Sequence, residues 1–98
     1  MTGRFVLTPR AQDDLEEIWD YTTDRWGLDQ AETYTRQLWT DIKAVASKPN
    51  IGRLCTDVRP DYHKYQSGSH VLFYRIICDG IDVVRILHER MDHERHLP

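Results

Sequence analysis

A β-hairpin near the C-terminus constrains the fold of this chain more than any other feature. Residues 70–78 read HVLFYRIIC, residues 81–89 read IDVVRILHE, and Asp79-Gly80 joins them. Asp-Gly between two apolar runs is typical of a two-residue turn with positive φ at both central residues. The turn predicts these cross-strand pairs: Cys78 with Ile81, Ile76 with Val83, Tyr74 with Arg85, Leu72 with Leu87, His70 with Glu89, Arg75 with Val84, Phe73 with Ile86 and Val71 with His88.

Both faces of this hairpin carry large apolar side chains, whereas a sheet with one solvated face alternates between apolar and polar residues. We expect helices to cover the face made by Leu72, Tyr74, Ile76, Val83 and Leu87. The other face is made by Val71, Phe73, Val84 and Ile86, with Arg75, His88 and Arg90 at its border. An apolar patch with a charged border is typical of a partner site, so we expect this face to stay open. The alternative is that a terminal segment or loop folds back over it.

Two helices are predicted before the hairpin. Thr8 followed by Pro9 is typical of a helix start, and Gly27 is typical of a helix end. A capping-box pattern at residues 29–32 predicts a second helix that ends before residue 49. The short connection favours an antiparallel helical hairpin. The acidic residues expected on the solvent face of the first helix are Asp13, Asp14, Glu16, Glu17 and Asp20.

Weaker strand signals complete the pattern. Residues 4–8 read RFVLT and predict an N-terminal strand, and residues 62–66 read YHKYQ and predict a strand that is followed by a turn. The sequence therefore predicts one α+β domain over residues 1–98, in which an N-terminal strand precedes an antiparallel two-helix hairpin that packs on a small antiparallel β-sheet.

Composition excludes several function classes. The net charge of −3 argues against general nucleic-acid affinity, which needs a surplus of Lys and Arg. The chain has no apolar run long enough to span a bilayer and no signal peptide at its N-terminus, so we expect a cytoplasmic protein. Cys55 and Cys78 lack the paired spacing of a zinc site and are interpreted as inert thiols. We expect neither a metal nor a cofactor.

The segment ILHERMDHERH at residues 86–96 concentrates charged side chains. His88 and Glu89 do not form an acid–base pair, because adjacent strand residues point to opposite faces. His88 and Arg90 share a face, which favours contact with an anion. A ribonuclease site stays open as an alternative. Its charge would come from Lys64, Arg75 and Arg90, and its proton transfer from Tyr62, His63 or His96.

Three tryptophans lie in the predicted helices, at Trp19, Trp26 and Trp39. Packing in the core of the helical hairpin is the simplest interpretation, because each indole buries a large area. A tryptophan that faces outward instead is an effective anchor for a partner.

Several segments together resemble the ParE branch of the RelE/ParE toxin superfamily. They are LTPRAQDDLEEIWDY, PNIGR, VRPDYHKYQSGSHVLFYR and VVRILHERMD, and they span nearly the whole chain. The most specific part is GSHVLFYR followed by ILHERMD. The resemblance implies a type II toxin without enzymatic activity, which inhibits DNA gyrase by binding and is neutralised by a ParD-like antitoxin.

The RelE branch, which cleaves ribosome-bound mRNA, is the alternative. Lys64 and Arg90 match basic positions of that branch, but Val71 stands where an arginine is expected, and no Tyr follows residue 74. The resemblance therefore favours the gyrase inhibitors. On this basis we expect target binding by Arg75, His88, Arg90, Asp92, His93 and Arg95. We expect antitoxin binding by Trp19, Trp26, Trp39, Val71, Phe73, Val84 and Ile86.

Overall fold

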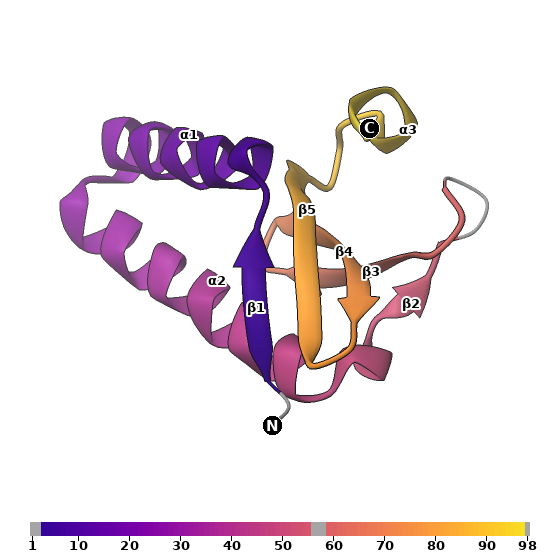
Figure 1. Cartoon of the computed structure of the whole chain (residues 1–98). Helices are drawn as coiled ribbons and strands as arrows, with labels where there is room; N and C mark the ends of the chain where they lie inside the picture. The colour runs from indigo at the N-terminus through magenta and orange to yellow at the C-terminus, as the bar shows by residue number, and fades with distance from the viewer. Residues whose placement is uncertain (1–2, 56–58, 98) are drawn as a thin grey trace.

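The computed structural model has the predicted α+β architecture, in which a helical hairpin packs on a five-stranded sheet (Figure 1). It describes residues 3–55 and 59–97. The strands are β1 (Arg4–Leu7), β2 (Arg53–Leu54), β3 (Tyr62–Ser67), β4 (His70–Ile77) and β5 (Gly80–His88). The helices are α1 (Pro9–Trp26), α2 (Leu28–Ser47), the 3-10 helix η1 (Pro49–Ile51) and α3 (His93–His96).

The sheet is mixed rather than purely antiparallel as expected. Its strand order is β1-β5-β4-β3-β2, and β1 runs parallel to β5 whereas the other neighbours are antiparallel. Gly80 pairs with Arg4 across the parallel ladder, and a Cβ at Gly80 would overlap the Arg4 carbonyl oxygen. This glycine therefore permits the close approach of β1 to β5 and does not serve as a turn residue.

The register of the β4–β5 hairpin differs from the predicted one. The turn consists of Cys78 and Asp79, and a β-bulge further along leaves Val84 as an extra residue in β5. The pairs are Ile76 with Ile81, Arg75 with Asp82, Tyr74 with Val83, Phe73 with Arg85, Leu72 with Ile86, Val71 with Leu87 and His70 with His88. Because a bulge changes which face the following residues occupy, Ile86 and Leu87 exchange their predicted faces.

Caps and a glycine determine the helix boundaries. The Thr8 hydroxyl accepts a hydrogen bond from the Ala11 amide at 3.1 Å and donates to the Val84 carbonyl at 2.7 Å, which ties the start of α1 to β5. Gly27, with φ of 93°, ends α1, and α2 follows at once. The predicted capping box does not form, because Asp29 lies inside the first turn of α2 and the cap position is Gly27.

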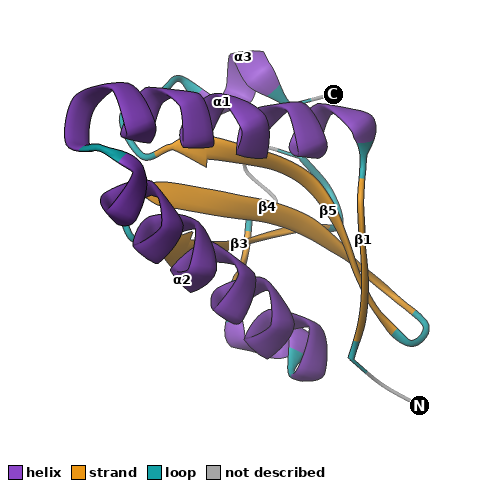
Figure 2. Cartoon of the chain, turned by 90° about the vertical axis from the view of Figure 1, so that its left-hand side faces the viewer, coloured by secondary structure: helices purple, strands orange, loops and turns teal. Residues whose placement is uncertain are grey.

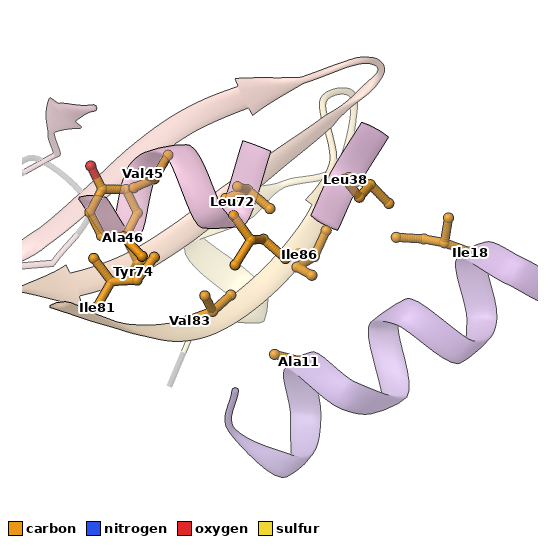
Figure 3. Close-up of a cluster of buried hydrophobic side chains, with 11 residues drawn as sticks. Ala11, Ile18, Leu38, Val45, Ala46, Leu72, Tyr74, Ile81, Val83 and Ile86 are labelled. Atoms are coloured by element: carbon orange, nitrogen blue, oxygen red, sulfur yellow. The ribbon is translucent and has the colours of Figure 1, made fainter. Parts of the chain in front are cut away.

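The main core lies between the helical hairpin and the sheet, and both long helices cover the same face (Figure 2). Figure 3 shows its side chains. They are Ala11, Ile18, Leu38, Ile42, Val45, Ala46, Leu72, Tyr74, Ile81, Val83 and Ile86. The helix-facing positions predicted for Leu72, Tyr74 and Val83 are confirmed. The prediction is wrong for Ile76, which is 41% exposed, and for Leu87, which belongs to the opposite face.

The opposite face of the sheet has a core of its own, made by Cys55, Tyr62, Val71, Phe73, Val84, Leu87 and Leu97. Leu97 is only 5% exposed, and the His93 ring meets the Phe73 ring edge-on, with centroids 4.9 Å apart. The C-terminal segment therefore folds back over this face, which is the alternative considered for it above.

Candidate protein-binding site

The face predicted to stay open is closed. Val71, Phe73, Val84 and Ile86 are 6, 0, 3 and 2% exposed. Ile86 points toward the helices because of the bulge, and the other three pack in the core that Leu97 completes. The prediction that these four side chains form an accessible antitoxin face is therefore wrong, since they are core residues of the folded chain.

A buried ion pair helps to hold the C-terminal segment in place. Arg85 donates from Nε and Nη2 to the Asp14 carboxylate, both at 2.8 Å, and from Nη1 to the His96 carbonyl at 2.7 Å. Asp14 also accepts the Ile86 amide at 2.9 Å. Hydrogen bonds from Arg85 to Asp14 raise the pKa of the guanidinium above its ordinary value. Asp14 was expected on the solvent face of the first helix, but it is buried because its carboxylate binds the Arg85 guanidinium and the Ile86 amide of β5.

An open apolar groove runs between α1, α2 and β1, and we call it the hairpin groove. Two adjoining hollows of about 360 and 420 Å³ form it, and both are lined by Leu15, Glu16 and Trp39. The first is also lined by Trp19, Asp20 and Thr35, and the second by Phe5, Val6, Leu7 and Gln12. The Trp39 and Phe5 rings lie 5.8 Å apart. The groove presents aromatic surface with an acidic border.

The three tryptophans do not form one surface. Trp19 and Trp39 are half-buried and line the hairpin groove together. Trp26 is 66% exposed and ends α1, at the turn between the helices, where Leu28 is 55% exposed. The structure therefore brings together two of the three predicted tryptophan anchors and leaves the third at the tip of the helical hairpin.

Arg75 is separated from the other predicted target-binding residues. It lies five positions along β4 from His70, which pairs with His88, so about 17 Å of strand lies between Arg75 and the end of β5. Its guanidinium pairs with the Asp82 carboxylate at 2.7 Å. Arg75 consequently belongs to the turn end of the hairpin.

The remaining predicted target residues lie at the end of β5 and in the segment that follows it, and we call residues 88–97 the tail segment. The His88 carbonyl accepts hydrogen bonds from the Met91 amide and from His93 Nε2, both at 3.0 Å. These bonds hold the tail segment in a compact turn. Its exposed charged side chains include Arg90, Asp92 and Arg95.

A third hollow, of about 410 Å³, lies between α1 and the end of the β4–β5 hairpin, and we call it the histidine cavity. Its lining includes Glu17, Ile18, Tyr21, His70, His88 and Met91. His70 and His88 are direct cross-strand partners with ring centroids 5.3 Å apart. This cavity was not predicted from the sequence, because the expected register paired His70 with Glu89 instead of His88. The spacing of the two histidines about the correct turn was the signal that could have located it.

His70 is held neutral at pH 7 by its surroundings. Burial and then the neighbouring His88 lower the pKa of the His70 imidazole from 6.5 to about 4. The Tyr34 hydroxyl lies 2.6 Å from His70 Nδ1 and accepts the Ser69 amide at 3.0 Å. Burial raises the pKa of Tyr34, so the phenol keeps its hydrogen. A neutral imidazole bonded to a tyrosine thus lies beside this cavity.

A fourth hollow, of about 450 Å³, opens at β2, β3 and the start of the tail segment, and its lining includes Arg53, Lys64, Gln66, Glu89 and His93. It differs from the ribonuclease site considered from the sequence. Of the residues named there, Lys64 lines this hollow, His63 and Arg75 line another, and Tyr62 is only 8% exposed.

The described part of the chain has neither a cluster of metal ligands nor a membrane-spanning helix. Within residues 3–55 and 59–97, no three His, Cys, Asp or Glu side chains gather where they could hold a metal ion. None of the described helices combines the length and apolar character that crossing a bilayer requires.

These features define a small α+β domain, with hollows on both sides of its first helix and a C-terminal segment folded over the sheet. Residues 5–93 match the family model described as "ParE toxin of type II toxin-antitoxin system, parDE". The chain belongs to the ParE toxin family of type II toxin–antitoxin systems.

Curated relatives agree with this assignment along nearly the whole chain. Toxin ParE1 of Mycobacterium tuberculosis (strain H37Rv) is 56% identical over 98 residues, which cover 99% of this chain and 100% of the relative. Toxin ParE1 of Caulobacter vibrioides is 40% identical over 93 residues, which cover 95% and 96%. Toxin ParE of Escherichia coli is 30% identical over 89 residues, which cover 90% and 86%.

A solved structure from the chromosomal ParDE system of P. aeruginosa has the same fold, with a TM-score of 0.75. The match covers 86% of this chain and 92% of that one at 19% sequence identity. At this identity the likeness concerns the fold alone.

Proposed function

We propose that this toxin acts in the cytoplasm by binding and inhibiting DNA gyrase, and that a ParD-like antitoxin neutralises it. The observation that carries the proposal is the ParE family match over residues 5–93. It supports the proposal because resemblance to the ParE branch implies inhibition of gyrase. A binding mechanism also suits the molecule, because the hairpin groove exposes aromatic and aliphatic side chains of α1, α2 and β1.

The hairpin groove is the surface we assign to the antitoxin. Trp19 and Trp39 supply large, rigid aromatic area there, and such side chains provide much of the binding energy at protein interfaces. Phe5 and Leu7 of the edge strand β1 extend the apolar surface. A segment with an apolar face fits this groove, as amphipathic segments do in other grooves between helices.

The tail segment is the surface we assign to the target. Arg90 is exposed beside the ordered turn that His88 organises, and Asp92 and Arg95 are exposed next to it. Exposed charges on an ordered turn favour long-range attraction and correct orientation of a partner. Arg75 lies outside this surface because the length of β4 separates it from the tail segment.

The proposal is tested by adding the purified toxin to gyrase and relaxed plasmid. We expect loss of supercoiling or accumulation of cleaved DNA, and we expect an equimolar amount of the cognate antitoxin to restore supercoiling. If supercoiling continues at a toxin excess that arrests cell growth, gyrase is not the target.

A ribonuclease is the second candidate, and the hollow beside β2 and β3 favours it. Arg53 and Lys64 supply positive charge there, and His93 and Glu89 are ionisable groups in the same lining. Phosphodiester cleavage needs this combination of charge stabilisation and proton transfer. Cleavage of mRNA on translating ribosomes by the purified toxin, lost on substitution of Lys64 by Ala, would support this function instead.

A further inference from the structure

We propose that the histidine cavity receives a short apolar segment of the antitoxin, whose backbone carbonyl oxygen accepts hydrogen bonds from His70 and His88. This inference rests on the proposed antitoxin and adds a second contact site to the hairpin groove.

The hydrogen bonds of the two imidazoles determine what they offer to a ligand. His88 Nδ1 accepts the Arg90 amide at 3.1 Å, so the neutral ring carries its hydrogen on Nε2. The Tyr34 hydroxyl accepts from Ser69 and lies 2.6 Å from His70 Nδ1; with the phenol hydrogen directed at this nitrogen, the His70 ring carries its own hydrogen on Nε2 as well. The cavity is therefore lined by two imidazoles that each retain one N–H donor. A hydrogen-bond acceptor matches them, whereas a metal ion requires a free imidazole lone pair.

The charges around the cavity select a neutral acceptor. Asp14 and Arg85 compensate one another through two hydrogen bonds of 2.8 Å. Of the described residues that line the cavity, Glu17 is the remaining one with a carboxylate. A carboxylate ligand would be repelled by Glu17, whereas a peptide carbonyl next to a Lys or Arg residue complements it.

The apolar walls of the cavity favour an apolar side chain in the bound segment. Ile18 and Ile86 line it from the helix-facing side, and Tyr21 and Met91 stand at 59% and 38% exposure. Exposed aromatic and methionine side chains beside a hollow suit an inserted apolar side chain, since methionine adapts its shape to what it contacts. A Leu, Ile or Met residue of the partner would fill this space.

The second half of β5 disfavours one mode of binding. β1 pairs with β5 only as far as Val83, and beyond that point the Ile86 amide, which would pair with an added strand, already donates to Asp14 at 2.9 Å. A partner segment is therefore held here through the two histidines and the apolar walls, and not as an extra strand of the sheet.

The position of α1 identifies the antitoxin as the occupant. Leu15 and Glu16 line the hairpin groove, and the next residues, Glu17 and Ile18, line the histidine cavity. Only the width of one helix, about 10 Å, separates the two sites. About three extended residues span that distance. One antitoxin chain can occupy the groove, cross α1 and place an apolar side chain in the cavity.

The first test compares two substitutions of His88 in the full-length toxin, with affinity for the full-length antitoxin measured by calorimetry. His88→Leu removes the donor and His88→Gln retains an N–H donor near the Nε2 position, while both lose the imidazole bond to the Arg90 amide. We expect His88→Leu to weaken binding about tenfold, as for one lost hydrogen bond, and His88→Gln to stay within about threefold of the wild type. Equal weakening by both variants would mean that His88 acts only by ordering the tail segment and would overturn the proposal.

The second test reverses the charge of one exposed residue at a time. Glu17→Lys should weaken antitoxin binding about fivefold, because the segment carries a basic residue near Glu17. Glu32→Lys makes the same change on α2, at an exposed residue that lines none of the hollows described above, and should leave the affinity unchanged. If Glu17→Lys binds the antitoxin as tightly as Glu32→Lys does, the assignment of the antitoxin segment to the histidine cavity is wrong.

The failure of this inference is distinguishable from failure of the proposed function. If the wild-type toxin binds the antitoxin and His88→Leu and Glu17→Lys bind equally well, the cavity is not part of the interface, although the antitoxin remains the partner. If the wild-type toxin does not bind the antitoxin, both proposals are wrong. As an independent readout, the Nε2–H signals of His70 and His88 in NMR spectra should shift when the complex forms.

Discussion

The Arg85 guanidinium and the Asp14 carboxylate form a buried bidentate ion pair, with Nε–Oδ2 and Nη2–Oδ1 distances of 2.8 Å. Asp14 comes from α1 and Arg85 from β5, and the same two residues also bond the Ile86 amide and the His96 carbonyl. This pair therefore joins the helical hairpin, the sheet and the tail segment, which between them carry all three of the proposed binding surfaces.

Removal of one partner of this pair should destabilise the fold strongly. Asp14→Ala leaves a buried guanidinium and a buried amide without their acceptor, and we expect a loss of about 3 kcal/mol in the free energy of unfolding. Asp82→Ala breaks the more exposed pair with Arg75 and should cost less than about 1 kcal/mol. Urea unfolding followed by circular dichroism measures both. A loss below about 1 kcal/mol for Asp14→Ala would show that the pair is not a structural link.

The tail segment covers the face of the sheet opposite the helices, so truncation of Leu97 should destabilise the fold. Leu97 is 5% exposed in the core with Phe73, so Leu97→Ala should lower the free energy of unfolding by about 2 kcal/mol. Arg95→Ala, two residues earlier and exposed, should change it by less than about 0.5 kcal/mol. Equal stability of the two variants in urea would contradict the packing of the tail segment on the sheet.

The lowered pKa of His70 predicts that the stability of the fold depends on pH. Its pKa of about 4 in the folded chain lies below the ordinary value of 6.5, because burial and then His88 disfavour the charged form and outweigh Asp14 and Glu89. The unfolded chain therefore binds more protons between these values, and folding stability decreases as the pH falls from 6.5 toward 4. The urea midpoint of the wild type should fall more steeply over this range than that of His70→Gln. Parallel pH profiles would show that His70 protonates freely.

The two long helices and the strands β1, β3, β4 and β5 could be predicted from the sequence, but the strand register and the short elements β2, η1 and α3 could not. Helical periodicity and the Thr8 cap locate α1, and the two apolar runs on either side of Asp79-Gly80 locate β4 and β5. The turn at Asp79-Gly80 was misplaced because Gly80 is required by contact with Arg4 of β1, a tertiary effect that local pattern does not record. The bulge at Val84 then changed the face of every later residue in β5.

The candidate site was less predictable because it depends on distant residues. Two of the tryptophans, Trp19 and Trp39, lie together in a groove, as an outward-facing anchor requires. The face around Phe73 was predicted to be open, but Leu97 covers it. The short, charged C-terminal sequence does not indicate this packing. Asp14 looked like a solvent-facing acid, since its partner lies 71 residues away on β5.

If the antitoxin binds in the hairpin groove, replacing an aromatic side chain of the groove by alanine should weaken the complex. Trp39→Ala should reduce affinity about thirtyfold, because Trp39 lines both hollows of the groove and aromatic residues dominate such interfaces. Trp26→Ala removes an equally large side chain at the tip of the helical hairpin and should stay within about threefold. Calorimetry with the full-length antitoxin compares them. A larger loss for Trp26→Ala would move the interface from the groove to the tip.

The most direct measurement is the amount of plasmid DNA that gyrase leaves cleaved in the presence of the wild-type toxin or of Arg90→Glu. The same two protein preparations are also tested for cleavage of mRNA on translating ribosomes. Arg90 is exposed on the proposed target surface, so the variant should fold and bind the antitoxin as the wild type does. We expect cleaved DNA with the wild type, at least tenfold less with Arg90→Glu, and intact mRNA with both. Cleaved mRNA together with unaffected gyrase would contradict the proposed function.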